Sequence, residues 1–163
     1  MVFLRRGRRH LSDRHRSDVG GRSQPHRRPD RGPLGVAVRT VLDTSILIAK
    51  DVPPIDGEVA ISAVSLAELH FGVLVATTAQ QRAQRLQRLV FIERAFEPLA
   101  VDASVARSYG QLAAAVHAYG RKPQPRALDL MIAATAHANN ARLVTRNADD
   151  LRGIEHLLGI DTI

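Results

Sequence analysis

The 163-residue sequence contains no cysteine and no tryptophan. Without cysteine there can be no disulfide, thiolate metal site or cysteine nucleophile, so any metal ion must be bound by oxygen or imidazole ligands. No apolar run approaches the ~18 residues of a membrane span, and Val2, Phe3 and Leu4 fall short of the apolar stretch of about 7 residues in a secretory signal. We therefore expect a cytoplasmic protein with no membrane segment.

The chain is 45% hydrophobic and 24% charged, a composition typical of a folded globular domain. Its net charge of +7 comes from residues 1–35, which hold ten arginines against three aspartates, whereas residues 36–163 hold 13 basic and 13 acidic groups. We expect one domain over residues 36–163. Residues 1–35 are predicted to be a disordered, arginine-rich extension, because they have too few apolar side chains to offset the entropy of ordering.

Two interpretations of this extension stay open. An arginine-rich arm would bind phosphates without sequence preference. Alternatively, the segment is not native, and translation starts near Val36 or Val38, just before the first regular pattern. No function is assigned to it here.

From residue 36 onward, short apolar segments alternate with helical ones. Strands are expected at 36–43, 58–62, 97–101, 142–145 and near 159–163, and helices at 44–50, 62–76, 78–95, 102–120 and 126–140. This alternation indicates an α/β fold with a parallel sheet covered by helices on both faces. Ligands of such sheets bind beyond the carboxyl ends of the strands, so the residues that follow the strands should gather at one edge.

Acidic residues lie at these strand ends and in the apolar helices. Asp43 ends the first strand, Glu68 lies in the helix after the second, Asp129 lies in a strongly apolar helix, and Asp149 and Asp150 follow the 142–145 strand. Partly desolvated carboxylates at one site repel one another unless some take up protons or a cation binds them. Hard divalent cations prefer oxygen ligands, so the pattern predicts a Mg²⁺ or Mn²⁺ site.

Structural interpretations of the same acids also stay open. They are a helix cap at Asp43, a capping box of Ser65 with Glu68, an ion pair of Arg126 with Asp129, and solvation of Asp149 and Asp150 in a turn. Each acid alone is a weak signal. Their order and placement along the chain carry the prediction.

Four blocks in this order resemble the PIN-domain ribonucleases and, within them, the VapC-type toxins of bacterial toxin–antitoxin pairs, over residues 39–160. The blocks are VLDTSIL with Asp43, ISAVSLAELHFG with Glu68, RALDLMIAATA with Asp129, and LVTRNADDL. The resemblance implies a three-layer α/β/α sandwich, in which helices cover both faces of a parallel sheet of about five strands. It also implies an acidic pocket that holds Mg²⁺ or Mn²⁺, and RNA as the substrate.

The closing block departs from the family pattern. The family often has an aspartate where this chain has Asn147, and commonly has an aromatic residue where this chain has Leu151. The interval between Asp43 and Glu68 is also short for the family. We assign the fourth acidic role to Asp150, with Asn147 as a neutral ligand or substrate contact.

These residues suggest metal-assisted hydrolysis of RNA phosphodiester bonds by the toxin of a toxin–antitoxin system. Asp43 and Asp129 are predicted to hold the cation, while Glu68 and Asp150 hold a second ion or orient the attacking water. The predicted substrate contacts are Arg126, Thr145, Arg146 and Asn147. The resemblance implies a VapB-type antitoxin as partner and a homodimer, for which residues 63–76 and 79–96 offer apolar helices.

Other functions fit parts of the sequence. Asn147 motivates a non-catalytic RNA-binding or interaction module with a degenerate PIN site. Phosphotransfer of the kind performed by response-regulator receivers is disfavoured, because Arg146 stands where a lysine is expected after the late strand. Arg121 and Lys122 are interpreted either as phosphate contacts or as a solvated basic loop.

Overall fold

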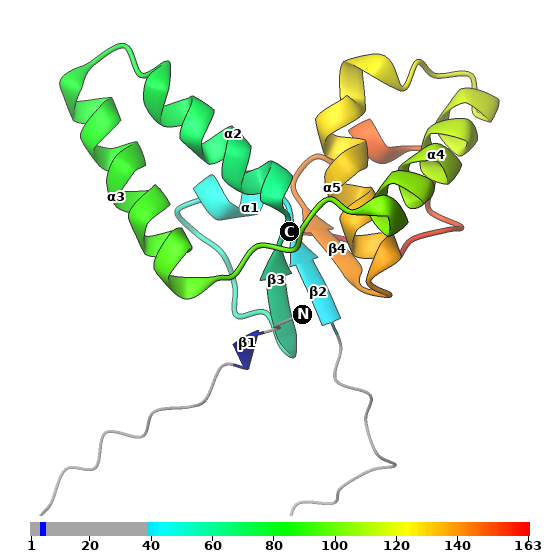
Figure 1. The fold of residues 1–163 in the computed structure, drawn as a ribbon, viewed down its shortest axis with the longest axis horizontal. Helices are drawn as coiled ribbons and strands as arrows, with labels where there is room; N and C mark the ends of the chain where they lie inside the picture. The colour runs from blue at the N-terminus through cyan, green and yellow to red at the C-terminus, as the bar shows by residue number, and fades with distance from the viewer. Residues whose placement is uncertain (1–3, 6–38) are drawn as a thin grey trace, which may run out of the picture.

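A computed structural model describes residues 4–5 and 39–163 (Figure 1). Its elements in chain order are β1 (Leu4–Arg5), β2 (Arg39–Leu42), α1 (Thr44–Ile48), β3 (Glu58–Ile61), α2 (Ala63–Leu74), α3 (Ala79–Ala95), α4 (Ala103–Ala118), η1 (Gln124–Arg126), α5 (Ala127–Ala138), β4 (Arg142–Thr145), η2 (Ala148–Leu151) and β5 (Ile160–Thr162). The expected α/β fold is therefore confirmed. Except for β1, the predicted disordered extension lies outside the described residues, so its disorder stays a prediction.

The strands form one sheet in the order β1-β3-β2-β4-β5. The four strands from β3 to β5 are mutually parallel, and Val41 of β2 lies between Ala60 of β3 and Leu143 of β4. The fifth strand, β1, is antiparallel to β3, with Leu4 opposite Val59. The sheet thus has the expected size, but four of its strands rather than five are parallel.

Alternate residues of each central strand enter two separate cores. Val41 and Leu143 belong to a core shared with α4 and α5, whereas their neighbours Leu42 and Val144 belong to a core shared with α1, α2 and α3. Figure 1 shows the corresponding helix pairs, α2 with α3 and α4 with α5, on opposite sides of the sheet. Because successive strand residues point to opposite faces, this is the three-layer α/β/α sandwich that was predicted.

Four of the helices are capped at their N-termini by polar side chains. The side chains of Asp43, Ser62, Thr78 and Asp102 each accept a hydrogen bond from a backbone N–H of the following helix. Helix α5 buries six of its twelve residues, which are mostly small, so it packs closely against the sheet and α4. Among residues 39–163, no helix has the length and hydrophobicity needed to cross a bilayer.

The strand predicted at residues 97–101 is wrong. This segment is reduced to a single parallel bridge between Leu99 and Ser62. Leu99 donates its N–H to Ile61 and accepts a hydrogen bond from Ala63, at 2.8 and 2.9 Å. The partner segment becomes helix α2 at Ala63, directly after the bridged Ser62, so the residues after Leu99 have no extended strand to pair with.

The neighbouring strands β2 and β4 mark the point where the chain changes from one face of the sheet to the other. After β2 the chain enters α1, whose Ile46 and Leu47 pack in the α2–α3 core. After β4 it enters η2, whose Leu151 packs in the α4–α5 core. Connections that diverge in this way open a crevice at the carboxyl ends of the two strands, where α/β proteins bind their ligands.

Candidate active site

Asp43 is the buried anchor of this crevice. It follows β2, is 6% exposed, and donates its backbone N–H to Val144 of β4 at 2.9 Å. Its Oδ1 accepts from the backbone of Thr44 at 2.7 Å, and its Oδ2 accepts from the hydroxyls of Ser45 at 2.6 Å and Thr145 at 2.7 Å. Asp43 is therefore the cap of α1, as one interpretation of the sequence proposed, and it is also held rigidly at the crevice.

Glu68 reaches the same region from α2. The hydroxyl of Thr44 donates to its Oε2 at 2.6 Å, which joins α2 to the start of α1. A capping box with Ser65 is not formed, because α2 begins at Ser62, whose side chain accepts from Val64. The buried hydroxyl of Ser65 has no hydrogen-bond partner among the described residues.

Asp129 shows that the four predicted acids converge. It lies in the first turn of α5 and is partly buried. Burial raises the pKa of Asp129 from its ordinary value of 3.8 to about 6, and the negative charges of Asp43, Asp150 and Glu68 add to this effect in that order. Burial alone can raise the pKa of a carboxyl group, but Asp43, Asp150 and Glu68 also lie close enough to Asp129 for their charges to act on it, and these four acids are called the cluster below.

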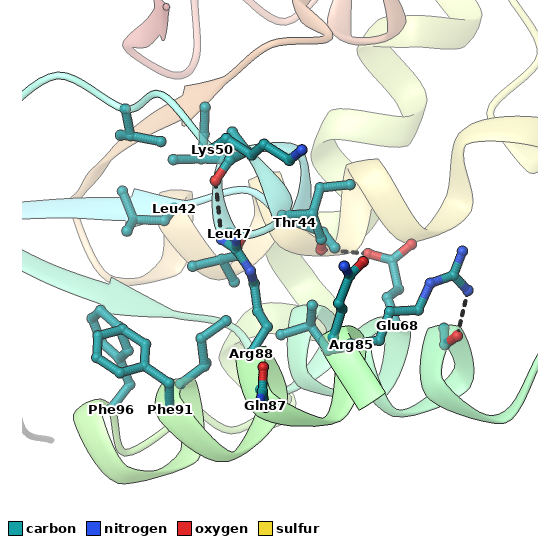
Figure 2. A pocket seen from close by; sticks show the side chains of 18 residues that line it. Leu42, Thr44, Leu47, Lys50, Glu68, Arg85, Gln87, Arg88, Phe91 and Phe96 are labelled. Carbon is teal, nitrogen blue, oxygen red and sulfur yellow. Dashed lines mark hydrogen bonds between the residues drawn. The ribbon is translucent and has the colours of Figure 1, made fainter. Parts of the chain in front are cut away.

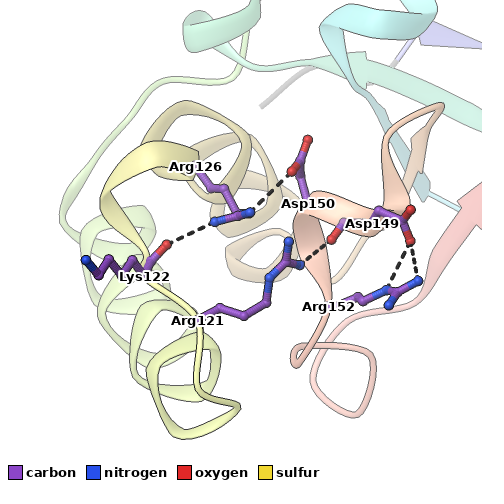
Figure 3. A network of polar contacts seen from close by, with 6 residues as sticks. All are labelled: Arg121, Lys122, Arg126, Asp149, Asp150 and Arg152. Carbon is purple, nitrogen blue, oxygen red and sulfur yellow. Dashed lines mark hydrogen bonds and ion pairs between the residues drawn. The ribbon is translucent and has the colours of Figure 1, made fainter.

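Asp150 stands at the rim of this cluster, next to a positive charge (Figure 3). Its Oδ1 lies 3.3 Å from Nε of Arg126, and their side chains are 45% and 21% exposed. The alternative pairing of Arg126 with Asp129 is thus replaced by a pairing with Asp150. Asp149, whose side chain is 84% exposed, instead forms an ion pair with Arg152, with 2.7 Å between its Oδ1 and a terminal guanidinium nitrogen. Asp150 is therefore the fourth acid of the cluster.

The donor set of the cluster fits a hard divalent cation. Carboxylate oxygens are the ligands that Mg²⁺ and Mn²⁺ prefer. Asp43 accepts three hydrogen bonds, and a carboxylate offers about four lone-pair sites, so Asp43 can still bind a cation. Among residues 39–163, no group of three or more His, Asp or Glu side chains is already arranged to hold a metal ion. The residues therefore match the ion in chemistry, and side-chain movement must bring them together around it.

The predicted substrate contacts lie at the end of β4 and in η1. Thr145 is 1% exposed, and its hydroxyl supports Asp43 rather than facing solvent. Arg146 is exposed. Its backbone N–H donates to the hydroxyl of Ser45 at 3.0 Å, and its guanidinium donates to the carbonyl of Asp51 at 2.6 Å. Asn147 is also exposed and donates its N–H to Thr145.

The sequence interpretation missed two supporting hydroxyls, those of Thr44 and Ser45. In the structure, Thr44 fixes Glu68 and Ser45 joins Asp43 to the backbone of Arg146. The signal was present, since two hydroxyl residues directly follow an aspartate at a strand end. Hydrogen bonds to a carboxylate fix its orientation and favour its charged form.

A groove of about 980 Å³ runs beside the cluster between α1, α2 and α3 (Figure 2). Its lining is largely apolar and includes Ile48 and Phe91, which are 59% and 69% exposed. Arg88 crosses it to donate to two carbonyls at the end of α1, at 2.8 and 2.9 Å. Thr44 and Glu68 also line the groove, so it opens directly onto the acid cluster.

Comparison with known proteins identifies the family. The model of the PIN domain matches residues 40–157. Ribonuclease VapC5 of Mycobacterium tuberculosis is 36% identical over 129 residues, 76% of this chain and 93% of that protein. Ribonuclease VapC4 of the same organism is 32% identical over 117 residues, 68% of this chain and 88% of that protein.

A solved structure agrees with these sequence matches. It is the crystal structure of VapBC-5 from Mycobacterium tuberculosis, a member of the VapBC family of toxin–antitoxin systems, with a TM-score of 0.67 and 37% identity. The match covers 77% of this chain and 98% of that chain. The resemblance inferred from the four sequence blocks is confirmed: the chain belongs to the PIN-domain family, in its VapC branch.

Proposed function

We propose that this protein is a Mg²⁺-dependent endoribonuclease of the cytoplasm, and that it is the toxin of a toxin–antitoxin pair. The observation that carries the proposal is the cluster of Asp43, Glu68, Asp129 and Asp150. Burial and the charges of the other three acids together raise the pKa of Asp129. The similar VapC proteins are named ribonucleases, which supports RNA as the substrate. The similar solved structure is of a toxin–antitoxin system, which supports an antitoxin partner.

Asp43 and Asp129 would hold Mg²⁺, or Mn²⁺ in its place. Asp43 suits this role because its hydrogen bonds fix its direction. Asp129 suits it because burial and the neighbouring acids, which raise its pKa, disfavour its charged form, and a bound cation would offset both effects. When bound, the cation lowers the pKa of a coordinated water and offsets charge that develops on the phosphate. Glu68 and Asp150 would orient this water or hold a second ion, and a carboxylate held at 2.6 Å by Thr44 is well placed to do so.

RNA binding near four carboxylates requires positive charge close by. Arg126, which contacts Asp150, and Arg146, which directly follows β4, would supply it, with Arg121 and Lys122 on the loop before α5. Asn147 is exposed and would contact the substrate or complete the metal shell. We reassign Thr145 from substrate contact to support of Asp43, because its hydroxyl is buried and engaged.

The decisive experiment compares three proteins purified identically: the wild type, Asp43→Asn and Asp149→Asn. The wild type should cleave structured RNA with Mg²⁺ and stop when EDTA is added. Asp43→Asn should lose this activity, since a neutral amide is a poorer ligand for a hard cation. Asp149→Asn should keep it, because Asp149 lies outside the cluster on an exposed side chain. Retained cleavage in Asp43→Asn would show that the nuclease is a contaminant or that the site lies elsewhere.

A second candidate function remains, because Asn147 stands at a position where the family often has an aspartate. In this view the chain is a non-catalytic RNA-binding module whose site no longer holds a metal. Calorimetry with Mg²⁺ separates the two functions. Binding in the millimolar range or tighter that disappears in Asp43→Asn supports the nuclease, and its absence together with retained RNA binding supports the module.

The antitoxin that we propose as partner would occupy the groove between α1, α2 and α3. The groove offers exposed apolar side chains at Ile48 and Phe91 with a basic side chain at Lys50, which suits an amphipathic segment with acidic flanks. Co-expression with the product of the neighbouring gene should yield a stable complex. Phe91→Ser should weaken this complex while leaving RNA cleavage by the free toxin intact, and unchanged binding would place the partner elsewhere.

A second copy of the chain is the other partner that we propose. Outside the groove lining, helices α2 and α3 expose the apolar side chains of Phe71, Leu74, Val75, Leu86 and Val90. Clustered apolar exposure of this kind marks protein interfaces. Sedimentation velocity should show a dimer for the wild type and a monomer for the double variant Phe71→Ser with Leu74→Ser. A monomeric wild type at micromolar concentration would refute the homodimer.

A further inference from the structure

The ion pair of Arg126 with Asp150 is incomplete. Nε of Arg126 lies 3.3 Å from Oδ1 of Asp150, yet this buried nitrogen has no hydrogen-bond partner among the described residues. The other end of the guanidinium donates to the carbonyl of Lys122 at 3.2 Å. The pair is therefore held by charge attraction without an aligned hydrogen bond, and the Nε–H donor is left unsatisfied.

A phosphate satisfies a guanidinium better than this carboxylate does. The planar fork of an arginine side chain matches two oxygens of a phosphate at once, and such bidentate contacts are short and strong. Arg126 lies in η1, three residues before Asp129 on the next helix, so it stands beside the cluster where the substrate phosphate would bind. A phosphate bound at the edge of the guanidinium that includes Nε would compete with Asp150 for this donor.

Asp150 is held at the rim of the acid cluster by this pairing. Its side chain is 45% exposed and Figure 3 shows it directed at Arg126, with no contact from any other cation in the network drawn. Its charge still reaches Asp129. Release of Asp150 would add one full negative charge, free of its counter-charge, to the group that would hold the metal.

We propose that Arg126 is a positioning residue that couples the two ligands: it holds Asp150 away from the metal site until an RNA phosphate takes over its guanidinium. Asp150 then joins Asp43 and Asp129. Metal binding and phosphate binding reinforce each other by the same factor, as thermodynamic linkage requires. Without RNA the protein has a low metal affinity, and the full acidic site assembles only when RNA is bound. This coupling rests on the proposed nuclease function.

Mn²⁺ affinity, measured by calorimetry on the full chain with inorganic phosphate as the probe, tests the coupling. Saturating phosphate should tighten Mn²⁺ binding by wild type about tenfold, which equals about 1.4 kcal/mol. Arg126→Gln should bind Mn²⁺ more tightly than wild type without phosphate, because Asp150 is already free. Phosphate should then give this variant little or no further gain.

Arg152→Gln is the matched control. It removes the same charge from the neighbouring pair with Asp149, at 2.7 Å, without touching Asp150. If Arg152→Gln tightens Mn²⁺ binding as much as Arg126→Gln does, the effect is one of overall charge and the proposed coupling is wrong. Unchanged or weaker Mn²⁺ binding by Arg126→Gln also overturns it.

Asp150→Asn gives an independent arm in case Arg126→Gln does not fold. Whatever its Mn²⁺ affinity without phosphate, it should lose the gain from phosphate, because it has no carboxylate for Arg126 to release. A variant that retains this gain contradicts the proposal. Failure of the coupling and failure of the nuclease function give different results. If the wild type neither binds Mn²⁺ nor cleaves RNA, the nuclease function is refuted. If the wild type does both and Arg126→Gln binds Mn²⁺ with the same affinity as the wild type, only the role of Arg126 is refuted.

Discussion

Replacement of Asp129 by asparagine should stabilise the metal-free protein at neutral pH while removing its activity. Asp129 is a partly buried carboxylate whose pKa is raised to about 6 by burial and by three neighbouring acids. Its ionised form is therefore less favourable in the folded chain than in the unfolded one. Asparagine has nearly the same shape and carries no charge, so it removes this cost together with the metal ligand.

The sign and size of the effect follow from linkage. The folded chain retains a proton on Asp129 at pH values where the unfolded chain has lost it, so this residue makes stability fall as the pH rises from 3.8 to about 6. For a fully buried group the difference would be worth ~3 kcal/mol. Asp129 is only partly buried, and solvent screening reduces the expected cost to about 1 kcal/mol.

Urea unfolding in EDTA at pH 4 and pH 7.5 measures this cost. Asp129→Asn should match the wild type near pH 4 and exceed it by about 1 kcal/mol at pH 7.5, which corresponds to a melting temperature about 3 °C higher. Asp149→Asn, with its exposed side chain, should show no such pH-dependent gain. The reasoning is refuted if Asp129→Asn is less stable than the wild type at pH 7.5, or if its advantage is the same at both pH values. Addition of Mg²⁺ in place of EDTA should stabilise the wild type and Asp149→Asn but not Asp129→Asn.

Two further predictions concern the hydroxyls that support the acids. Thr145→Val leaves Asp43 without one of its donors inside the protein and should lower the free energy of unfolding by about 1–2 kcal/mol, measured in urea; Thr145→Ser should restore it. Thr44→Val should cost less than about 1 kcal/mol, because Thr44 is only partly buried, yet reduce Mg²⁺-dependent RNA cleavage by about tenfold through misorientation of Glu68. Rescue of cleavage by Thr44→Ser separates loss of the hydroxyl from loss of packing.

The sequence predicts the sheet well because local pattern and burial agree there. In β2 and β4, consecutive apolar residues such as Val41 and Leu42 enter opposite cores, so each strand is an unbroken apolar run of the kind expected for a covered parallel sheet. The segment around Leu99 has a similar composition, but its partner Ser62 is the cap of α2, so only one residue pair forms between them. The composition of the segment favoured a strand, and the start of the neighbouring helix prevented it.

The acid cluster could be predicted for a topological reason, and its contacts could not. Residues that follow neighbouring parallel strands must meet at one edge, which is enough to bring Asp43 and Asp150 together. Which partner each acid takes depends on how η1 packs beside η2, and nothing in the spacing distinguishes Asp129 from Asp150 as the partner of Arg126. The sequence neighbour was the simpler expectation, and tertiary packing selected the distant one.

The groove and the cluster share Thr44 and Glu68, and this has a consequence for control of the proposed nuclease. A segment seated in the groove contacts a residue of the acidic site directly, because the bond from Thr44 to Glu68 forms part of the groove wall. Inhibition then requires no conformational change carried through the sheet, whose strands β2 and β4 are buried over their last three residues. A partner that displaces Glu68 by a small distance breaks a 2.6 Å hydrogen bond and misplaces one of the four acids. A partner that binds the apolar groove would in this way disrupt the arrangement of the four acids on which the proposed catalysis depends.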